Sequence, residues 1–146
     1  MALKMSLVGE LYMYDESIEP FRTIIPEVCE FDFQMFTFYV FDVRKYNQIH
    51  NWFLLNAFAP HEREINVGKK LLNNSTIELL NRDLTLAISD PIAAKMHFPP
   101  LAGFMFGSTD IDDQYNNQLR EVQKVIHNTC SWSKFKKCMF TYHYSW

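Results

Sequence analysis

Three stretches of the chain alternate between apolar and polar residues, which is the pattern of strands with one buried face. They cover residues 6–14, 31–41 and 138–146. The middle stretch alternates at first and then carries apolar residues on both faces over residues 36–41. This change predicts a strand that ends buried on both faces, or a bulge near residues 34–36. In the last stretch, one face would carry Cys138, Phe140, Tyr142, Tyr144 and Trp146.

Between the second and third strands, apolar residues recur at helical spacing and predict three helices. The first would run from Asp42, whose carboxylate would cap it, to about residue 58. The second would begin with a capping box between Ser75 and Glu78 and would be closed by Asp90-Pro91, before a short helical turn at residues 92–96.

The third predicted helix covers residues 110–128, with Ser108, Thr109 or Asp110 as its cap. Strands and helices are thus mixed along 146 residues, a length that suits one domain. We therefore expect residues 1–146 to form a single α+β domain. Its antiparallel or mixed sheet of about three to five strands would pack against three helices.

Composition adds one unusual feature to this picture. Aromatic residues make up 16% of the chain, with 13 Phe and 7 Tyr, which is more than a core of this size needs. Some of these rings are therefore expected to line a pocket or an interface, and we lean towards a homo-oligomer. The formal net charge of -3 offers no basic field for extended nucleic acid.

The cysteines indicate the compartment. Three are present, far apart and without the spacing of a zinc site, which predicts a reducing environment. No apolar run approaches the roughly 18 residues that a membrane span requires. We therefore expect a soluble cytoplasmic protein with no membrane partner, cofactor or metal.

The stretch at residues 42–53 carries a polar side next to its apolar stripe, formed by Arg44, Asn47, His50 and Asn51. On a helix these side chains would lie within successive turns. In one interpretation they form a ligand site, where Arg44 binds an anionic group and the other three read polar edges. In the other, His50 is a core histidine bonded to a backbone carbonyl, and Arg44 pairs with Asp112 or Asp113.

The turn at residues 103–109 is a second candidate, because its glycines could direct backbone amides towards a phosphate at the next helix. Aspartates at positions 110, 112 and 113 bring negative charge to the same helix end. A phosphate would therefore be repelled unless Arg44 or Lys45 offset that charge. A tight turn with ordinary capping is the alternative interpretation, and a hard cation held by the aspartates and His50 is a weaker one.

Two motifs stand out in residue identity. The first is Arg44-Lys45-x-Asn47-x-Ile49-His50-x-Trp52-Phe53, and the second is Gly103-Phe104-x-Phe106-Gly107-Ser108 followed by Asp112 and Tyr115. Together with the closing Ser145-Trp146, they resemble a family of small uncharacterised proteins from bacteriophages and gut bacteria. The resemblance covers roughly the C-terminal two thirds of the chain, and Met105 departs from the Phe that the family more often has.

The resemblance implies a phage or prophage origin. Phage accessory proteins of this kind often counter host defence, by inhibiting a protein or by sequestering a nucleotide signal. Our leading hypothesis is a non-enzymatic counter-defence protein that sequesters a small nucleotide-like signal. The alternatives are an inhibitor that binds a host defence protein and, more weakly, a metal-assisted hydrolase using His50 and Asp112.

In the leading hypothesis, Arg44 and Lys45 would bind phosphate, while Tyr142 or Trp146 would stack on the ligand. Asn47, His50 and Asn51 would read the polar edges of the ligand. The turn and helix start at residues 103–115 would form the other half of the site. The candidate ligand-binding residues are Arg44, Lys45, Asn47, His50, Asn51, Ser108, Asp112, Tyr115, Tyr142 and Trp146.

Overall fold

A computed structural model describes residues 2–14, 33–63, 65–103 and 105–146. Within them, the protein has a four-stranded antiparallel sheet and four α-helices, which confirms the predicted α+β class. The strands lie in the order β2-β1-β4-β3. Their bounds are β1 Lys4–Tyr14, β2 Phe33–Arg44, β3 Val67–Leu72 and β4 Cys138–Ser145. The α-helices are α2 Asn47–Asn56, α3 Asn74–Ser89, α4 Pro91–His97 and α5 Asp113–Ser131.

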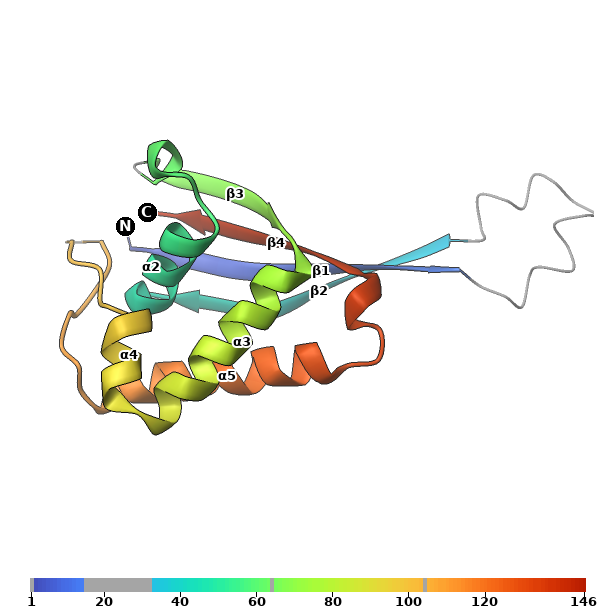
Figure 1. The fold of residues 1–146 in the computed structure, drawn as a ribbon. Helices are drawn as coiled ribbons and strands as arrows, with labels where there is room; N and C mark the ends of the chain where they lie inside the picture. Colours follow the sequence, from blue (N-terminus) through green and yellow to red (C-terminus); the bar gives the residue numbers. More distant parts are fainter. Residues whose placement is uncertain (1, 15–32, 64, 104) are drawn as a thin grey trace, which may run out of the picture.

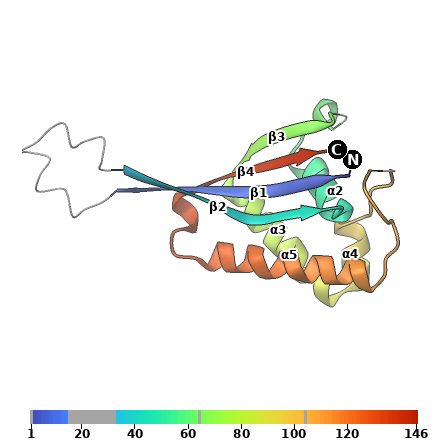
Figure 2. The same ribbon diagram turned by 180° about the vertical axis from the view of Figure 1, so that it is seen from behind.

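The helices are gathered on one side of the sheet. Helices α2 and α3 lie in front of the strands in Figure 1, and the reverse view in Figure 2 places the strands in front of them. Helix α3 packs against both α4 and α5. The described part of the fold is therefore two layers deep, with a helix-covered face that holds the core and an opposite face on which none of the described helices lies.

The core face follows the predicted alternation in β4. Cys138, Phe140, Tyr142 and Tyr144 are buried, and Trp146 just beyond the strand packs against them. The core-facing residues of β1 are Leu3 just before the strand, Met5, Leu7 and Leu11. Because β1 and β4 are the two central strands, their apolar face carries the helices.

Strand β2 contains a bulge, but not where the sequence pattern placed it. Leu7 pairs with Phe41 and Val8 pairs with Tyr39, so Val40 has no partner of its own. This extra residue allows both Val40 and Phe41 to be buried, while Tyr39 remains 67% exposed. The prediction of a strand buried on both faces throughout residues 36–41 was therefore wrong, since the run of apolar residues marks a bulge near its end.

Strand β2 also continues further than predicted, and this displaces the first helix. Asp42 pairs with Ser6 and Arg44 pairs with Lys4 inside the sheet, so Asp42 does not cap a helix. Lys45 then adopts a φ of 59° and turns the chain. Helix α2 begins at Asn47, with Tyr46 at its N-cap and no side-chain cap bond.

The other helices match their predicted positions better than their predicted caps. Helix α3 follows Asn73 rather than a capping box at Ser75, and it ends before Asp90-Pro91 as expected. Asp90 caps α4, the predicted short helical turn, by accepting from the Ile92 amide. Helix α5 is capped by Asp112, which lies beyond the three predicted caps.

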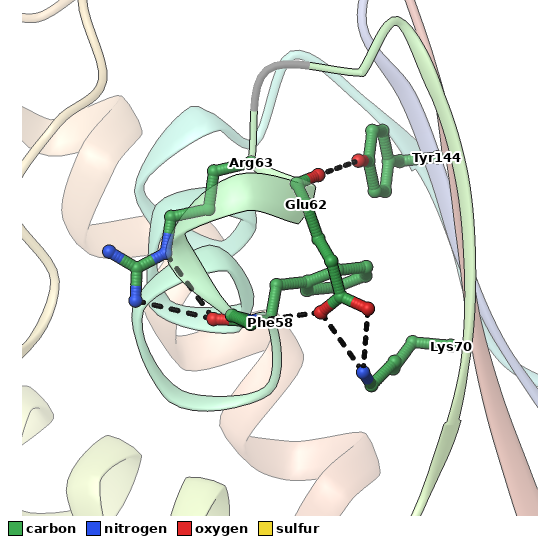
Figure 3. A network of polar contacts seen from close by, with 6 residues as sticks. Phe58, Glu62, Arg63, Lys70 and Tyr144 are labelled. Atoms are coloured by element: carbon green, nitrogen blue, oxygen red, sulfur yellow. Dashed lines mark hydrogen bonds and ion pairs between the residues drawn. The ribbon is translucent and has the colours of Figure 1, made fainter.

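The edge strand β3 was not predicted, because its Gly-Lys-Lys centre lacks apolar alternation. A network around Glu62 fixes the connection between α2 and β3 (Figure 3). Glu62 accepts from the Ala59 amide and from Lys70 Nζ at 3.0 Å, and both contacts lower the pKa of its carboxyl. The Tyr144 hydroxyl donates to the Glu62 carbonyl at 3.4 Å. These contacts join the 3-10 turn Pro60–Glu62 to the sheet edge.

Candidate functional site

Asn47 attaches helix α2 to the loop before α5. Its side chain is only 2% exposed. Nδ2 donates to the carbonyls of Ser108 at 2.7 Å and Phe106 at 3.1 Å, and Oδ1 accepts from the Leu101 amide at 3.0 Å. Both N–H groups are thereby occupied. The structure therefore gives Asn47 a structural role, and Asn51, which donates to the Pro99 carbonyl at 2.9 Å, extends the same attachment.

His50 is enclosed in the aromatic core. Its Nδ1 lies 2.8 Å from the Tyr142 hydroxyl, and its ring centroid lies 4.7 Å from Tyr144, 5.4 Å from Trp146 and 5.9 Å from Phe106. Burial lowers the pKa of His50 to about 4, so the ring is neutral at pH 7. His50 is a core histidine, as one interpretation expected, but its partner is a tyrosine hydroxyl instead of a backbone carbonyl.

The aromatic residues predicted to stack on a ligand are already stacked within the core. Tyr142 is fully buried, and its ring lies parallel to that of Phe53 at 3.9 Å. Burial also raises the pKa of its hydroxyl well above the ordinary value. Trp146 stacks on Tyr144 at 5.1 Å. One face of each ring is thus covered by another side chain.

Arg44 lies apart from the other predicted site residues. It is exposed at the end of β2, and its pairing with Lys4 places it on the face of the sheet without helices. Within the described ranges, Arg44 forms no ion pair with Asp112 or Asp113. The ion pair that the second interpretation gave Arg44 is therefore absent from this part of the chain, because Arg44 belongs to strand β2 and not to helix α2.

Four of the predicted residues do come together, around a cavity of about 230 Å³ between the start of α2 and the start of α5. We call this cavity the Lys45 pocket. Its lining comprises Lys45, Gln48, Gly107, Ser108, Asp110, Asp112, Gln114, Tyr115 and Gln118. Gly107 has a φ of 93°, and a Cβ there would lie 3.2 Å from the Lys45 Cβ. The left-handed backbone at Lys45 and the close approach of Gly107 thus form one wall.

The sequence did not identify the most buried polar groups of this pocket. Gln48 and Gln118 are 2% and 9% exposed, and Gln48 Nε2 donates to Gln118 Oε1 at 2.8 Å. Within the described residues, Gln48 Oε1 and Gln118 Nε2 have no hydrogen-bond partner, yet neither is sealed from solvent. A glutamine on the otherwise apolar stripe of Tyr115, Leu119 and Val122 is the signal that could have indicated this pair.

Several other groups of the pocket hold the backbone in place. Asp112 accepts from the Tyr115 amide at 3.0 Å, and Ser108 Oγ accepts from the Asp110 amide at 3.1 Å. The Tyr115 hydroxyl donates to the carbonyls of Ala94 and Phe98, and burial raises its pKa to about 12. Lys45, Asp110, Gln114 and the Gln48–Gln118 pair make no such side-chain contact to the described backbone of this loop and remain available for a ligand.

The fold and the pocket together define a two-layer α+β protein with a small polar cavity between two helix starts. Comparison of the chain with protein-family models, with curated proteins and with solved structures finds no match. Among the described residues, no three His, Cys, Asp or Glu side chains cluster as a metal site would require. In the same part of the chain, no helix has the length and apolar character to cross a bilayer. Function must accordingly be argued from the chemistry of the cavity.

Proposed function

We propose that this protein binds a small nucleotide-like molecule in the Lys45 pocket and sequesters it without turnover. The observation that carries the proposal is the Gln48–Gln118 pair, which offers an acceptor and a donor on two otherwise buried side chains. Nucleobase edges carry donors and acceptors that such amides recognise. Both amide atoms are open to solvent, so a bound base would exchange their contacts with water for direct hydrogen bonds.

Charge and volume indicate which part of the ligand would enter. One lysine and two aspartates line the pocket, so phosphate is disfavoured and an uncharged base or sugar is preferred. The cavity of about 230 Å³ is smaller than the roughly 300–1,000 Å³ of pockets that enclose whole ligands. We therefore assign the base to the pocket and leave the phosphate outside it. This revises the expectation that Arg44 and Lys45 together bind phosphate.

The backbone at Lys45 supports a binding role for this wall. A non-glycine residue in the left-handed region costs on the order of 1–2 kcal/mol and persists where its surroundings fix it. Here the Lys45 amide donates to the Leu3 carbonyl at 2.9 Å, which fixes that backbone. This left-handed backbone conformation places the Lys45 side chain at the pocket that it lines.

The biological role follows from the resemblance to phage accessory proteins. A sponge for a nucleotide signal would act in the bacterial cytoplasm, where such signals are made, and would need only affinity and abundance. Chemical turnover would require a positioned acid, base or nucleophile. The Tyr115 hydroxyl and Asp112 carboxylate are already engaged in backbone contacts.

Calorimetry and thermal shift with adenosine, cyclic nucleotides and ADP-ribose test the proposal on the intact chain. Gln118→Ala should weaken binding at least tenfold, because the pocket loses the Gln118 amide donor and the acceptor that orients Gln48. Gln123→Ala on the same helix, outside the pocket, is the matched control. The proposal fails if none of these compounds binds, or if Gln118→Ala and Gln123→Ala bind them with the same affinity. The unfolding midpoint of each unliganded variant shows that it is folded.

A protein interface is the second candidate function, favoured by a different observation. Phe36 and Trp132 are 50% and 41% exposed and line an apolar groove of about 620 Å³ beside Phe38. Exposed apolar patches of this kind are typical of interaction sites. If this groove carries the counter-defence activity, the double variant Phe36→Ser and Trp132→Ser would abolish protection of phage in plaque assays, and Gln118→Ala would not.

The geometry does not favour a metal-assisted hydrolase that uses His50 and Asp112. His50 is buried in the core and does not line the pocket with Asp112.

A further inference from the structure

The face of the sheet opposite the described helices is hollowed across its four described strands. The hollow has a volume of about 580 Å³, within the roughly 300–1,000 Å³ of sites for small molecules. Short residues such as Ser6, Gly68 and Ser145 line it together with the long side chains of Lys4, Tyr39 and Lys69. This difference in side-chain length gives the open face its concave shape.

The strand register places lysines on both sides of this hollow. On β4, His143 pairs with Ser6 on one side and with Lys69 on the other, and Ser145 pairs with Lys4. Paired residues of antiparallel strands share a face, so Lys4 and Lys69 flank β4 from opposite sides. With strands about 4.8 Å apart, their Cα atoms are on the order of 12 Å from each other. Both flexible side chains can therefore reach one ligand above His143.

The lining of the hollow is positively charged, although the whole protein carries -3. Its described lining contains no carboxylate. Neither Lys4 nor Lys69 forms an ion pair within the part of the chain that the structure describes, and Arg44, opposite Lys4, forms none either. Asp42 pairs with Ser6 on the same face but lies outside the lining. A concave surface of one sign concentrates small ions of the opposite sign.

We propose that this hollow is a second ligand site, which takes a phosphate-bearing small molecule. Lys4 and Lys69 contact the phosphate oxygens, and the exposed ring of Tyr39 stacks on an attached base. A nucleoside polyphosphate carries both groups, whereas free pyrophosphate carries only the first. The site is independent of the Lys45 pocket, which lies on the helix-covered side and excludes phosphate.

Calorimetry at low ionic strength with pyrophosphate and with ATP tests this assignment. The ATP titrations use the Gln118→Ala background, so that the Lys45 pocket does not contribute. Lys4→Ala and Lys69→Ala should each weaken both probes about tenfold, since each removes a charge-assisted contact. Tyr39→Ala should weaken ATP and leave pyrophosphate unchanged. Asp42→Asn should tighten both, because it removes the neighbouring negative charge.

Lys95→Ala is the matched control, because it removes an equal charge from the exposed side of α4. Equal losses for Lys95→Ala and Lys69→Ala would overturn the proposal, and so would the absence of binding by both probes. If Tyr39→Ala binds ATP as tightly as the protein with Tyr39 does, the nucleotide assignment is overturned. Adenosine, which lacks phosphate, reports on the Lys45 pocket alone. It should bind Lys69→Ala as well as the unaltered protein, so the two proposals fail separately.

Discussion

The Nδ1 atom of His50 lies 2.8 Å from the hydroxyl of Tyr142, in a region where both side chains are fully shielded from solvent. The other ring nitrogen, Nε2, has no hydrogen-bond partner among the described residues. A protonated ring would therefore place an uncompensated charge among aromatic side chains. This pair should make the stability of the fold sensitive to pH, and it engages the His50 ring within the core.

Stability should fall as the pH is lowered from about 6.5 to about 4. The pKa of His50 is lowered by burial from 6.5 in the unfolded chain to about 4 in the folded protein, so between these values the unfolded chain binds more protons. This difference corresponds to about 3 kcal/mol of lost stability below pH 4. Urea unfolding across this range should show a clearly shallower pH dependence for His50→Gln. Identical slopes for the two proteins would contradict the buried neutral ring.

Tyr142→Phe should destabilise the protein at neutral pH. The substitution keeps the stacked ring over Phe53 but removes the only hydrogen-bond partner of the His50 imidazole within the described residues. Leaving a buried polar group unsatisfied costs about 1–3 kcal/mol. Tyr144→Phe is the control, because the Tyr144 hydroxyl makes only a long contact to the Glu62 carbonyl. Equal urea midpoints for the two variants would argue against an important His50–Tyr142 bond.

Asn47→Ala should cost about 3 kcal/mol, considerably more than Asn51→Ala. Asn47 makes three hydrogen bonds to the loop between α4 and α5, whereas Asn51 makes one. Each bond contributes roughly 1 kcal/mol, and its loss leaves backbone groups without partners. Urea unfolding at pH 7 gives both values. Similar losses for the two variants would show that Asn47 does not attach this loop.

Lys45→Gly should stabilise the protein while weakening ligand binding. Glycine adopts the observed φ of 59° without the steric cost that any other residue meets there. Lys45→Ala removes the same charge but keeps the strained backbone, so the two variants should differ by about 1 kcal/mol in unfolding free energy. If Lys45→Ala is as stable as Lys45→Gly, the left-handed backbone carries no strain.

Part of the lining of the candidate site could be located from sequence, although its buried glutamines could not. The two motifs indicated that helix α2 and the turn before α5 belong together, and the bonds from Asn47 to that turn show that they do. Lys45, Ser108, Asp112 and Tyr115 meet at one pocket. Yet Asn47 and His50 proved to be structural, because burial and hydrogen-bond partners are properties of the packed core that helical spacing does not reveal.

The sequence by itself determined the elements whose signal is local. The alternation of residues 138–146 fixed the buried face of β4, and the periodicity of Leu80, Leu84, Leu119 and Val122 fixed the core faces of α3 and α5. Each pattern depends only on the geometry of its own strand or helix. Neighbouring residues along the chain therefore carry all the information that is needed.

Only the tertiary structure decided where β2 ends and which face Arg44 occupies. Residues 42–44 would suit a helix start, but the pairing of Asp42 and Arg44 with β1 keeps them extended. The partner strand lies some forty residues away in sequence. The pattern of residues 42–44 alone therefore cannot indicate whether a strand or a helix forms there. The same pairing places Arg44 beside Lys4 on the open face and leaves Lys45 at the turn to line the pocket beside Gln48 and Gln118.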